Sequence, residues 1–296
     1  PNQFGMDSFD LEDAFGAQES HLCSADLREF IAEYHLDLNQ NGKFNPRDIF
    51  GSHRDMDHIY NTPRAWFMGR FLAPHTYRWD GENADFTPES DDIPWSYVPE
   101  RRVAAEDIQY LLSSHYQGTP YDPYAATAAE KGIYRPIGVN RNDFMALLQL
   151  RPDVPEDFRA VEWLAFASNA FNTMLTLYAN VDTAPEYLAN TTGDVSTDNF
   201  YWASRLLAAM ADASYAKSVF HIERYTLSVG AKANHIINTC DDAQRAEADP
   251  AARAALREKA NADLAAMAKA ETTDTLNKVL FELSSGMKNA YSRSDA

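Results

Sequence analysis

The stretch Phe144-Met145-Ala146-Leu147-Leu148-Gln149-Leu150 has the length and the apolar content of a β-strand. Two further runs of strand length follow it, Val161 to Ala167 and Thr173 to Val181. The Pro-rich segment Arg151 to Pro155 lies after the first run and is typical of a turn. The sequence therefore predicts neighbouring antiparallel strands within a strand block at residues 140–182.

Helices are expected before the strand block. The segment Ser24 to Leu36 repeats its apolar residues at helical spacing behind Ser24 as a candidate N-cap, and a second such segment runs from Ile108 to His115 until a Gly-Thr-Pro turn. Between them, residues 44–99 are rich in aromatic residues, Asp, Asn and Pro, with a short helix expected from Arg64 to Phe71. Since long ordered loops commonly carry binding surface, residues 44–99 are predicted to be a loop-rich insertion.

The chain after the strand block is predicted to be a helical region, residues 196–296, interrupted near Cys240 to Pro250 and near Glu271 to Thr273. Asp249 is expected to be the N-cap of one helix, with proline in its first turn. The core face of the last helix is expected to hold Leu276, Val279, Leu280, Leu283 and Met287. A strand block flanked by helices predicts an α+β fold, with residues 1–296 as one domain.

Composition and charge limit the possible partners. The 296 residues are 45% hydrophobic, which is enough for a sizeable core. With 44 acidic against 26 basic side chains, the net charge of -18 repels nucleic acid and anionic membrane surfaces, so neither is predicted as a partner.

The cysteine count and the chain's start bear on its cellular location. The two cysteines, Cys23 and Cys240, lie far apart, which predicts no disulfide framework and a cytoplasmic location. No run approaches the roughly 20 apolar residues that span a bilayer, and the first residues lack the features of a signal peptide. Because the sequence starts at Pro1 without an initiator Met, we expect either processing or a piece of a longer protein.

Several residues carry side chains that could take part in chemistry. The segment Gly51 to His58 holds two histidines and two aspartates, but their spacing fits no zinc pattern, so a hydrogen-bonded loop is favoured and neither metal nor cofactor is predicted. Cys23 lies near His21 but has no supporting nucleophile motif, which favours a structural thiol. Pro1 as a secondary-amine base is set aside, because chains that use such a base are short.

The segment His115-Tyr116-Gln117-Gly118-Thr119-Pro120-Tyr121-Asp122 combines hydrogen-bonding groups, aromatic rings and a glycine turn. Such a combination suits a small-molecule pocket. It equally suits a capped helix followed by an ordered turn. The residues alone leave both interpretations open.

A set of short motifs occurs in order along the chain up to about Trp202. They are Pro1-Asn2-Gln3, Tyr34-His35-Leu36-Asp37 through Gly42-Lys43-Phe44-Asn45, Ile59-Tyr60-Asn61-Thr62-Pro63-Arg64, His115-Tyr116-Gln117-Gly118-Thr119, Leu150-Arg151-Pro152 and Glu162-Trp163-Leu164-Ala165-Phe166. Together they resemble the dipeptidase A family of lactic-acid and related bacteria. Each motif is short, and their ordered combination is specific.

This resemblance implies a cysteine-type N-terminal-nucleophile hydrolase, related to choloylglycine hydrolases and penicillin acylases, with a four-layer αββα sandwich. In such enzymes the α-amino group of the first residue is the base for its own thiol. This sequence starts with proline instead of that cysteine. The resemblance therefore implies that the nucleophile and the first strands lie on a segment absent from this sequence, so that the fold is partial and the chain alone is inactive.

The resemblance also implies roles for individual residues. Asn2 corresponds to an asparagine beside the oxyanion, and Arg64 to an arginine whose charge favours the thiolate, so both are catalytic candidates. Their structural alternatives are a turn amide for Asn2 and a surface ion pair with Asp55 or Asp57 for Arg64. Substrate-side contacts are expected from the following residues: His115, Tyr116, Thr119.

The leading hypothesis is therefore a dipeptidase, a thiol protease that hydrolyses short peptides without a metal or cofactor. Its expected partners are short peptides and the missing N-terminal segment, and the resemblance also implies a possible homo-oligomer. One alternative is a hydrolase of bile-salt-like or penicillin-like amides. Another is a non-catalytic module whose Tyr- and Trp-rich loops hold a ligand such as a sugar. A fragment should show an unpaired sheet edge, whereas a binding module should be complete.

Overall fold

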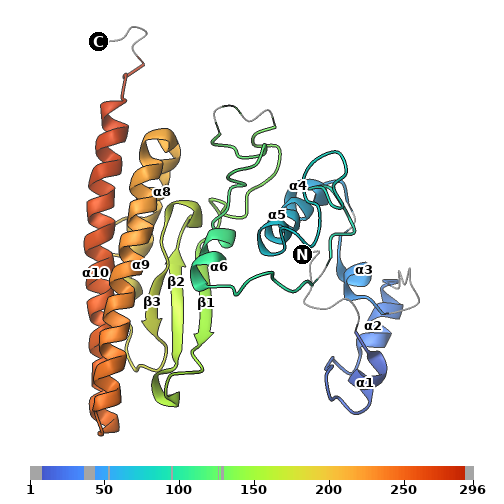
Figure 1. The fold of residues 1–296 in the computed structure, drawn as a ribbon, viewed down its shortest axis with the longest axis horizontal. Helices are drawn as coiled ribbons and strands as arrows, with labels where there is room; N and C mark the ends of the chain where they lie inside the picture. The colour runs from blue at the N-terminus through green and yellow to red at the C-terminus, as the bar shows by residue number, and fades with distance from the viewer. Residues whose placement is uncertain are drawn as a thin grey trace. The chain divides into compact units, whose positions relative to one another are not determined.

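The computed structural model describes residues 9–36, 44–52, 54–94, 96–125, 127 and 130–290 (Figure 1). These residues form two compact units. The first unit contains residues 1–104 and 116–137, and the second unit contains residues 105–115 and 138–296. The expectation that residues 1–296 form one domain stays a prediction.

The first unit is built from short helices and long connecting loops. The helices are α1 (Leu11–Phe15), α2 (Leu27–Glu33), α3 (Pro46–Phe50), α4 (Asp57–Tyr60) and α5 (Thr62–Leu72). The expected helix near Arg64 is thus confirmed as α5, whereas α3 and α4 were not predicted. The Ser24 cap is wrong, because Asp26 occupies the N-cap of α2 and the Ser24 carbonyl accepts the Leu27 N–H.

Two tryptophans organise the core of the first unit. The Trp66 indole N–H donates to the Trp79 carbonyl at 2.9 Å, and the Trp79 indole N–H donates to the Ala73 carbonyl at 2.9 Å. Both rings are buried. Gly69 allows this packing, because a Cβ at residue 69 would lie 2.3 Å from the Trp79 ring. Trp66 and Trp79 therefore supply core rather than exposed ring surface.

The second unit contains α6 (Ala105–Leu112) and a three-stranded antiparallel sheet in the order β1-β2-β3. The strands are β1 (Phe144–Leu150), β2 (Ala160–Phe166) and β3 (Leu175–Tyr178). The predicted antiparallel strands are confirmed, with a shorter last strand than expected. Leu112 of α6 packs against Met145, Ala165 and Met174. The whole is an α+β fold.

Long helices follow the sheet. They are α8 (Phe200–Ala213), α9 (Tyr215–Ala246) and α10 (Pro250–Ser285), after the short α7 (Glu186–Ala189), and α9 and α10 lie side by side (Figure 1). Asp249 caps α10 as predicted, because its carboxylate accepts the Ala251 N–H at 3.1 Å. The predicted break near Glu271 to Thr273 is wrong. The Thr272 hydroxyl donates to the Ala268 carbonyl at 2.7 Å, which lets a polar residue lie buried inside a continuous helix.

The expected core face of α10 is partly wrong. Leu276 and Val279 are buried, and Leu283 is half-buried. Leu280 and Met287 are exposed, with 52% and 66% of their surfaces accessible. The reason is that Met287 lies beyond the end of the helix and that Leu280 follows Val279 directly, so that it points toward a different side of the helix.

One residue of α10 closes the outer edge of β3. The Asn261 side chain accepts the Tyr178 N–H at 2.9 Å and donates to the Tyr178 carbonyl at 3.0 Å, as a neighbouring strand would. Asn261 is buried. The amide thus satisfies two main-chain groups that would otherwise lie buried at the sheet edge.

Replacing Asn261 with alanine is expected to lower the free energy of unfolding by about 1–3 kcal/mol, because two buried main-chain groups of Tyr178 lose their partners. Urea denaturation of the full natural polypeptide measures the change. Asn277→Ala is the matched control, since Asn277 is exposed on the same helix and its loss should change stability by less than about 0.5 kcal/mol. Equal losses in the two variants would contradict the edge-closing role.

The outer edge of β1 differs from that of β3. The Ala167 N–H donates to the Asp143 carbonyl at 3.0 Å, and antiparallel pairing alternates, so the main-chain groups of Leu148 and Leu150 point away from β2. Within the described residues β1 pairs with β2 alone. The side chains of Leu148 and Leu150 are 76% and 73% exposed. β1 is therefore an apolar edge strand, which is the feature expected of a partial sheet.

Among the residues that the structure describes, no helix combines the length and the apolar content that crossing a bilayer requires.

Candidate active site

The predicted site residues divide between the two units. Arg64, Tyr116 and Thr119 belong to the first unit, and His115 belongs to the second. Asn2 lies outside the described residues. The structure brings together Arg64 and Tyr116, which lie 52 positions apart in the sequence.

Arg64 and Tyr116 meet at one main-chain carbonyl. Arg64 is the third residue of α5, and its Nε donates to the Arg135 carbonyl at 3.3 Å. The Tyr116 hydroxyl donates to the same oxygen at 2.8 Å and also hydrogen-bonds the Arg64 guanidinium. The Arg135 N–H in turn donates to the Ile59 carbonyl at 3.0 Å, just before α5. These contacts hold the Arg64 guanidinium in a fixed place.

The surroundings of Arg64 are unusual for a cation. Burial lowers the pKa of its guanidinium, the charge of Arg135 lowers it further, and Tyr116 acts in the opposite direction. Burial raises the pKa of the Tyr116 hydroxyl well above its ordinary value, so this group stays protonated as a donor. The alternative ion pair with Asp55 or Asp57 is not formed in the described structure. Asp57 is buried and its carboxylate is already bonded within its own loop, to Ser52, Arg54 and Asn61.

Tyr116 and Thr119 form a tight turn. Tyr116 has a φ of 66°, a left-handed conformation that is rare for a residue with a large side chain. The Thr119 hydroxyl donates to the Tyr116 carbonyl at 2.7 Å and accepts the Tyr121 N–H at 3.2 Å. Gly118 has a φ of 77°, which glycine adopts without strain. The expectation that a helix continues to His115 is wrong, because α6 ends at Leu112.

His115 has a different environment, in the second unit. Its Nε2 lies 3.2 Å from the Tyr215 hydroxyl of α9, and the two rings meet edge to face with centroids 5.6 Å apart. The Tyr215 ring also contacts Phe171. His115 is buried. Its described contacts are those of a packed histidine with a hydrogen-bond partner.

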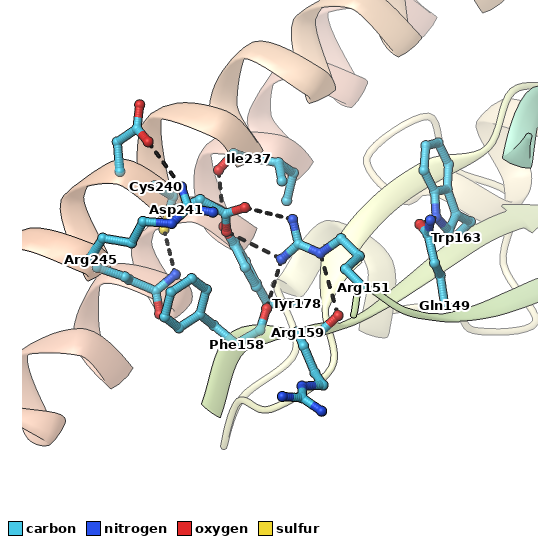
Figure 2. Close-up of polar contacts among 12 residues, drawn as sticks. Gln149, Arg151, Phe158, Arg159, Trp163, Tyr178, Ile237, Cys240, Asp241 and Arg245 are labelled. Atoms are coloured by element: carbon cyan, nitrogen blue, oxygen red, sulfur yellow. Dashed lines mark hydrogen bonds and ion pairs between the residues drawn. The ribbon is translucent and has the colours of Figure 1, made fainter. Parts of the chain in front are cut away.

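Sequence reasoning missed a second polar cluster, which Figure 2 shows at the end of the sheet. Arg151 donates through Nη1 and Nη2 to both carboxylate oxygens of Asp241 in α9, at 2.7 and 3.2 Å. The Tyr178 hydroxyl donates to the same carboxylate at 2.7 Å, and Arg151 also reaches the Phe158 carbonyl at 2.7 Å. Burial and the nearby Asp241 raise the pKa of Tyr178. The cluster ties β1 and β3 to the long helix.

The two cysteines lack the surroundings of a nucleophile. Cys240 is buried in α9 with its thiol 3.5 Å from the Leu256 carbonyl, and burial raises the pKa of that thiol. Cys23 is a free, half-buried thiol. The nearby His21 ring pairs with Asp13 at 3.0 Å rather than with Cys23. Within the described residues no group of three or more His, Cys, Asp or Glu is arranged to hold a metal ion.

Comparison with known proteins places the chain among peptidases. Residues 1–228 match peptidase family C69. The chain belongs to peptidase family C69, which confirms the resemblance found in its motifs.

The most informative relatives are bacterial. The chain is 44% identical to a protein named dipeptidase from Bifidobacterium longum, with all of the chain and 63% of the relative aligned. It is 42% identical to a probable dipeptidase A from Streptococcus pyogenes, with all of the chain and 60% of the relative aligned. A dipeptidase A from Lactobacillus helveticus is 40% identical over 73% of this chain and 43% of its own length. The chain thus spans less than two thirds of the length of these relatives.

Proposed function

We propose that the chain is the C-terminal part of a cysteine dipeptidase that hydrolyses short peptides. The observation that carries the proposal is the alignment of the whole chain with proteins named dipeptidase at 42–44% identity. Membership of a peptidase family supports the reaction class. The nucleophile is proposed to be an N-terminal cysteine on a segment outside these 296 residues.

The chemistry proposed is acyl transfer through a thiolate. The α-amino group of the N-terminal cysteine takes the thiol proton, the sulfur attacks the peptide carbonyl, and the amine leaves with a proton. Water then hydrolyses the thioester and restores the thiol. Arg64, held by Tyr116 and by the Arg135 carbonyl, would favour the thiolate by its positive charge. Asn2 would donate to the oxyanion.

The cysteines of this chain support a nucleophile elsewhere. Cys240 is buried with a raised pKa, which disfavours the reactive thiolate. The histidine nearest to Cys23 in the sequence, His21, pairs with Asp13, which leaves it poorly placed to serve as a base for that thiol.

The proposal extends to the fold. The apolar edge strand β1 supports a sheet that continues on another segment, within the four-layer αββα arrangement. His115, Tyr116 and Thr119 stay proposed as substrate-side contacts, although the hydroxyls of Tyr116 and Thr119 already have intramolecular partners. A cytoplasmic location and a homo-oligomer also remain proposals.

The alternatives have less support. A hydrolase of bile-salt-like or penicillin-like amides would use the proposed chemistry. The relatives described above are instead named as dipeptidases. A sugar-binding module would need exposed rings, whereas Trp66, Trp79 and Tyr116 are buried.

The test uses the full natural polypeptide. Intact mass spectrometry under denaturing conditions should find a polypeptide that begins with cysteine, and the protein should hydrolyse dipeptides. Replacing that cysteine with alanine should abolish hydrolysis, while Cys23→Ser, the matched control, should leave the rate within about twofold. Hydrolysis that survives both the alanine replacement and thiol alkylation would contradict the proposal.

A further inference from the structure

Arg135 brings a second positive charge to Arg64. Its main chain is fixed by the Ile59 carbonyl at 3.0 Å and by the two donors to its own carbonyl, Arg64 Nε and Tyr116. Its guanidinium lies over the Tyr60 ring at 5.5 Å from the centroid. Both arginines are half-buried.

Neither guanidinium has a carboxylate partner among the described residues. Elsewhere in the chain arginines pair with acids, as in Arg70 with Asp80 at 2.8 Å and Arg78 with Asp85 at 2.7 Å. A chain with 44 acidic residues and a net charge of -18 offers many such partners. Placing two like charges together without one is unfavourable, and the lowering of the Arg64 pKa by Arg135 reflects this. A bound anion would remove the repulsion.

The neighbouring side chains favour a particular kind of anion. Tyr134 packs against Tyr116 with ring centroids 6.4 Å apart, and its hydroxyl donates to Glu89 at 2.8 Å. Burial and then the nearby acids Glu130, Asp80 and Glu89 raise the pKa of Tyr121, whose ring lies 4.8 Å from that of Tyr134. Acidic groups near Tyr121 and Tyr134, and two arginines near Tyr116, disfavour a multiply charged anion and suit a zwitterion.

We propose that Arg64 and Arg135 together bind the α-carboxylate of a short peptide. A guanidinium offers five donors in a plane, and a carboxylate can accept two of them in parallel. Here Arg64 is bonded to the Arg135 main chain, and the Arg135 guanidinium lies over the Tyr60 ring. The choice of a peptide as the source of the carboxylate rests on the proposed dipeptidase function. Arg135 is then the residue that distinguishes a free peptide terminus from an internal peptide bond.

The test compares a dipeptide with its C-terminal amide in the full natural protein. In Arg135→Gln, KM for the free dipeptide should rise by about 10-fold to 100-fold, as expected for the loss of charge-assisted hydrogen bonds. KM for the amide should not change, and kcat should stay within about threefold for both. Arg135→Lys should give a smaller rise. Arg78→Gln, which removes an exposed arginine of the same unit, is the control and should alter neither KM.

A binding measurement separates this proposal from the dipeptidase proposal. Isothermal titration of the wild-type protein with N-acetylglycine should show saturable binding that N-acetylglycinamide lacks and that Arg135→Gln weakens by about 10-fold or more. If no peptide is hydrolysed but this binding is seen, the function fails and the carboxylate site stands. The carboxylate site is overturned by a different result. In that result peptides are hydrolysed, but Arg135→Gln and Arg135→Lys change KM for the dipeptide and for its amide equally, or change neither KM.

Discussion

Replacing Arg64 with glutamine is expected to lower kcat/KM of the full natural protein for dipeptides by about 10²–10³-fold. The guanidinium is half-buried and fixed by Tyr116 and the Arg135 carbonyl, so its charge acts on neighbours through little water. Without it the pKa of the proposed nucleophilic thiol rises, because the thiolate loses a stabilising charge. The loss should therefore be larger at pH 7 than at pH 9, and a pH–rate profile measures the difference.

The control for this prediction lies on the same helix. Arg70 pairs with Asp80 at the surface, and Arg70→Gln should leave the profile unchanged. Arg64→Lys keeps the charge and should retain part of the activity while losing the bond from Nε to Arg135. A uniform loss at all pH values in Arg64→Gln, with normal stability, would show that Arg64 does not set the thiol pKa.

The second large effect is on stability. Replacing Asp241 with asparagine should lower the free energy of unfolding by about 3–5 kcal/mol, because it leaves the Arg151 charge without its bidentate partner. The Arg151 and Asp241 side chains are 16% and 5% exposed, so water cannot replace the lost contact. The Tyr178 hydroxyl would keep the Ile237 carbonyl as an acceptor at 3.1 Å, so the expected loss comes from the ion pair. The midpoint of urea denaturation measures the effect.

Asp242 provides a neighbouring control. It pairs with Arg245 at 3.0 Å but is 81% exposed, so Asp242→Asn should cost less than about 1 kcal/mol. A double variant that replaces both Arg151 and Asp241 with Met and Leu should recover much of the stability, since it buries no unpaired charge. If Asp241→Asn and Asp242→Asn cost the same, the buried pair has no special weight in stability.

The fold was predictable where the signal is local. The runs around Phe144 and Val161 predicted β1 and β2 within a residue, because a strand buried on one side needs apolar residues of that length. The Asp249 cap was predictable because an Asp directly before a proline is a local signal for the start of a helix. The predicted break near Thr272 failed because a threonine hydroxyl can bond back to its own helix, and the pattern of residue types does not reveal this. Asn261 acts across 83 positions, which no local pattern encodes.

The candidate site was predictable only in part. Arg64 and Tyr116 were found because their motifs resemble a family, and their meeting in space follows from contacts 52 positions apart. Arg135 was missed because its significance lies in having no acidic partner among the described residues, which only a three-dimensional arrangement can show. The spacing of Leu112 and His115 predicted that the helix extends to His115. The structure ends α6 at Leu112, so His115 lies outside the helix.

Gly69 restricts which sequences the first unit can accept. Even the smallest side chain at this position would collide with the buried Trp79 ring, and that ring cannot turn away without giving up its bond to Ala73. Trp66 would lose its fit through the same displacement. The helix that presents Arg64 therefore tolerates no side chain at one of its inward positions, although alanine would be the better helix former there in isolation. Close packing against Trp79 therefore excludes alanine at residue 69, although helix propensity alone would favour it.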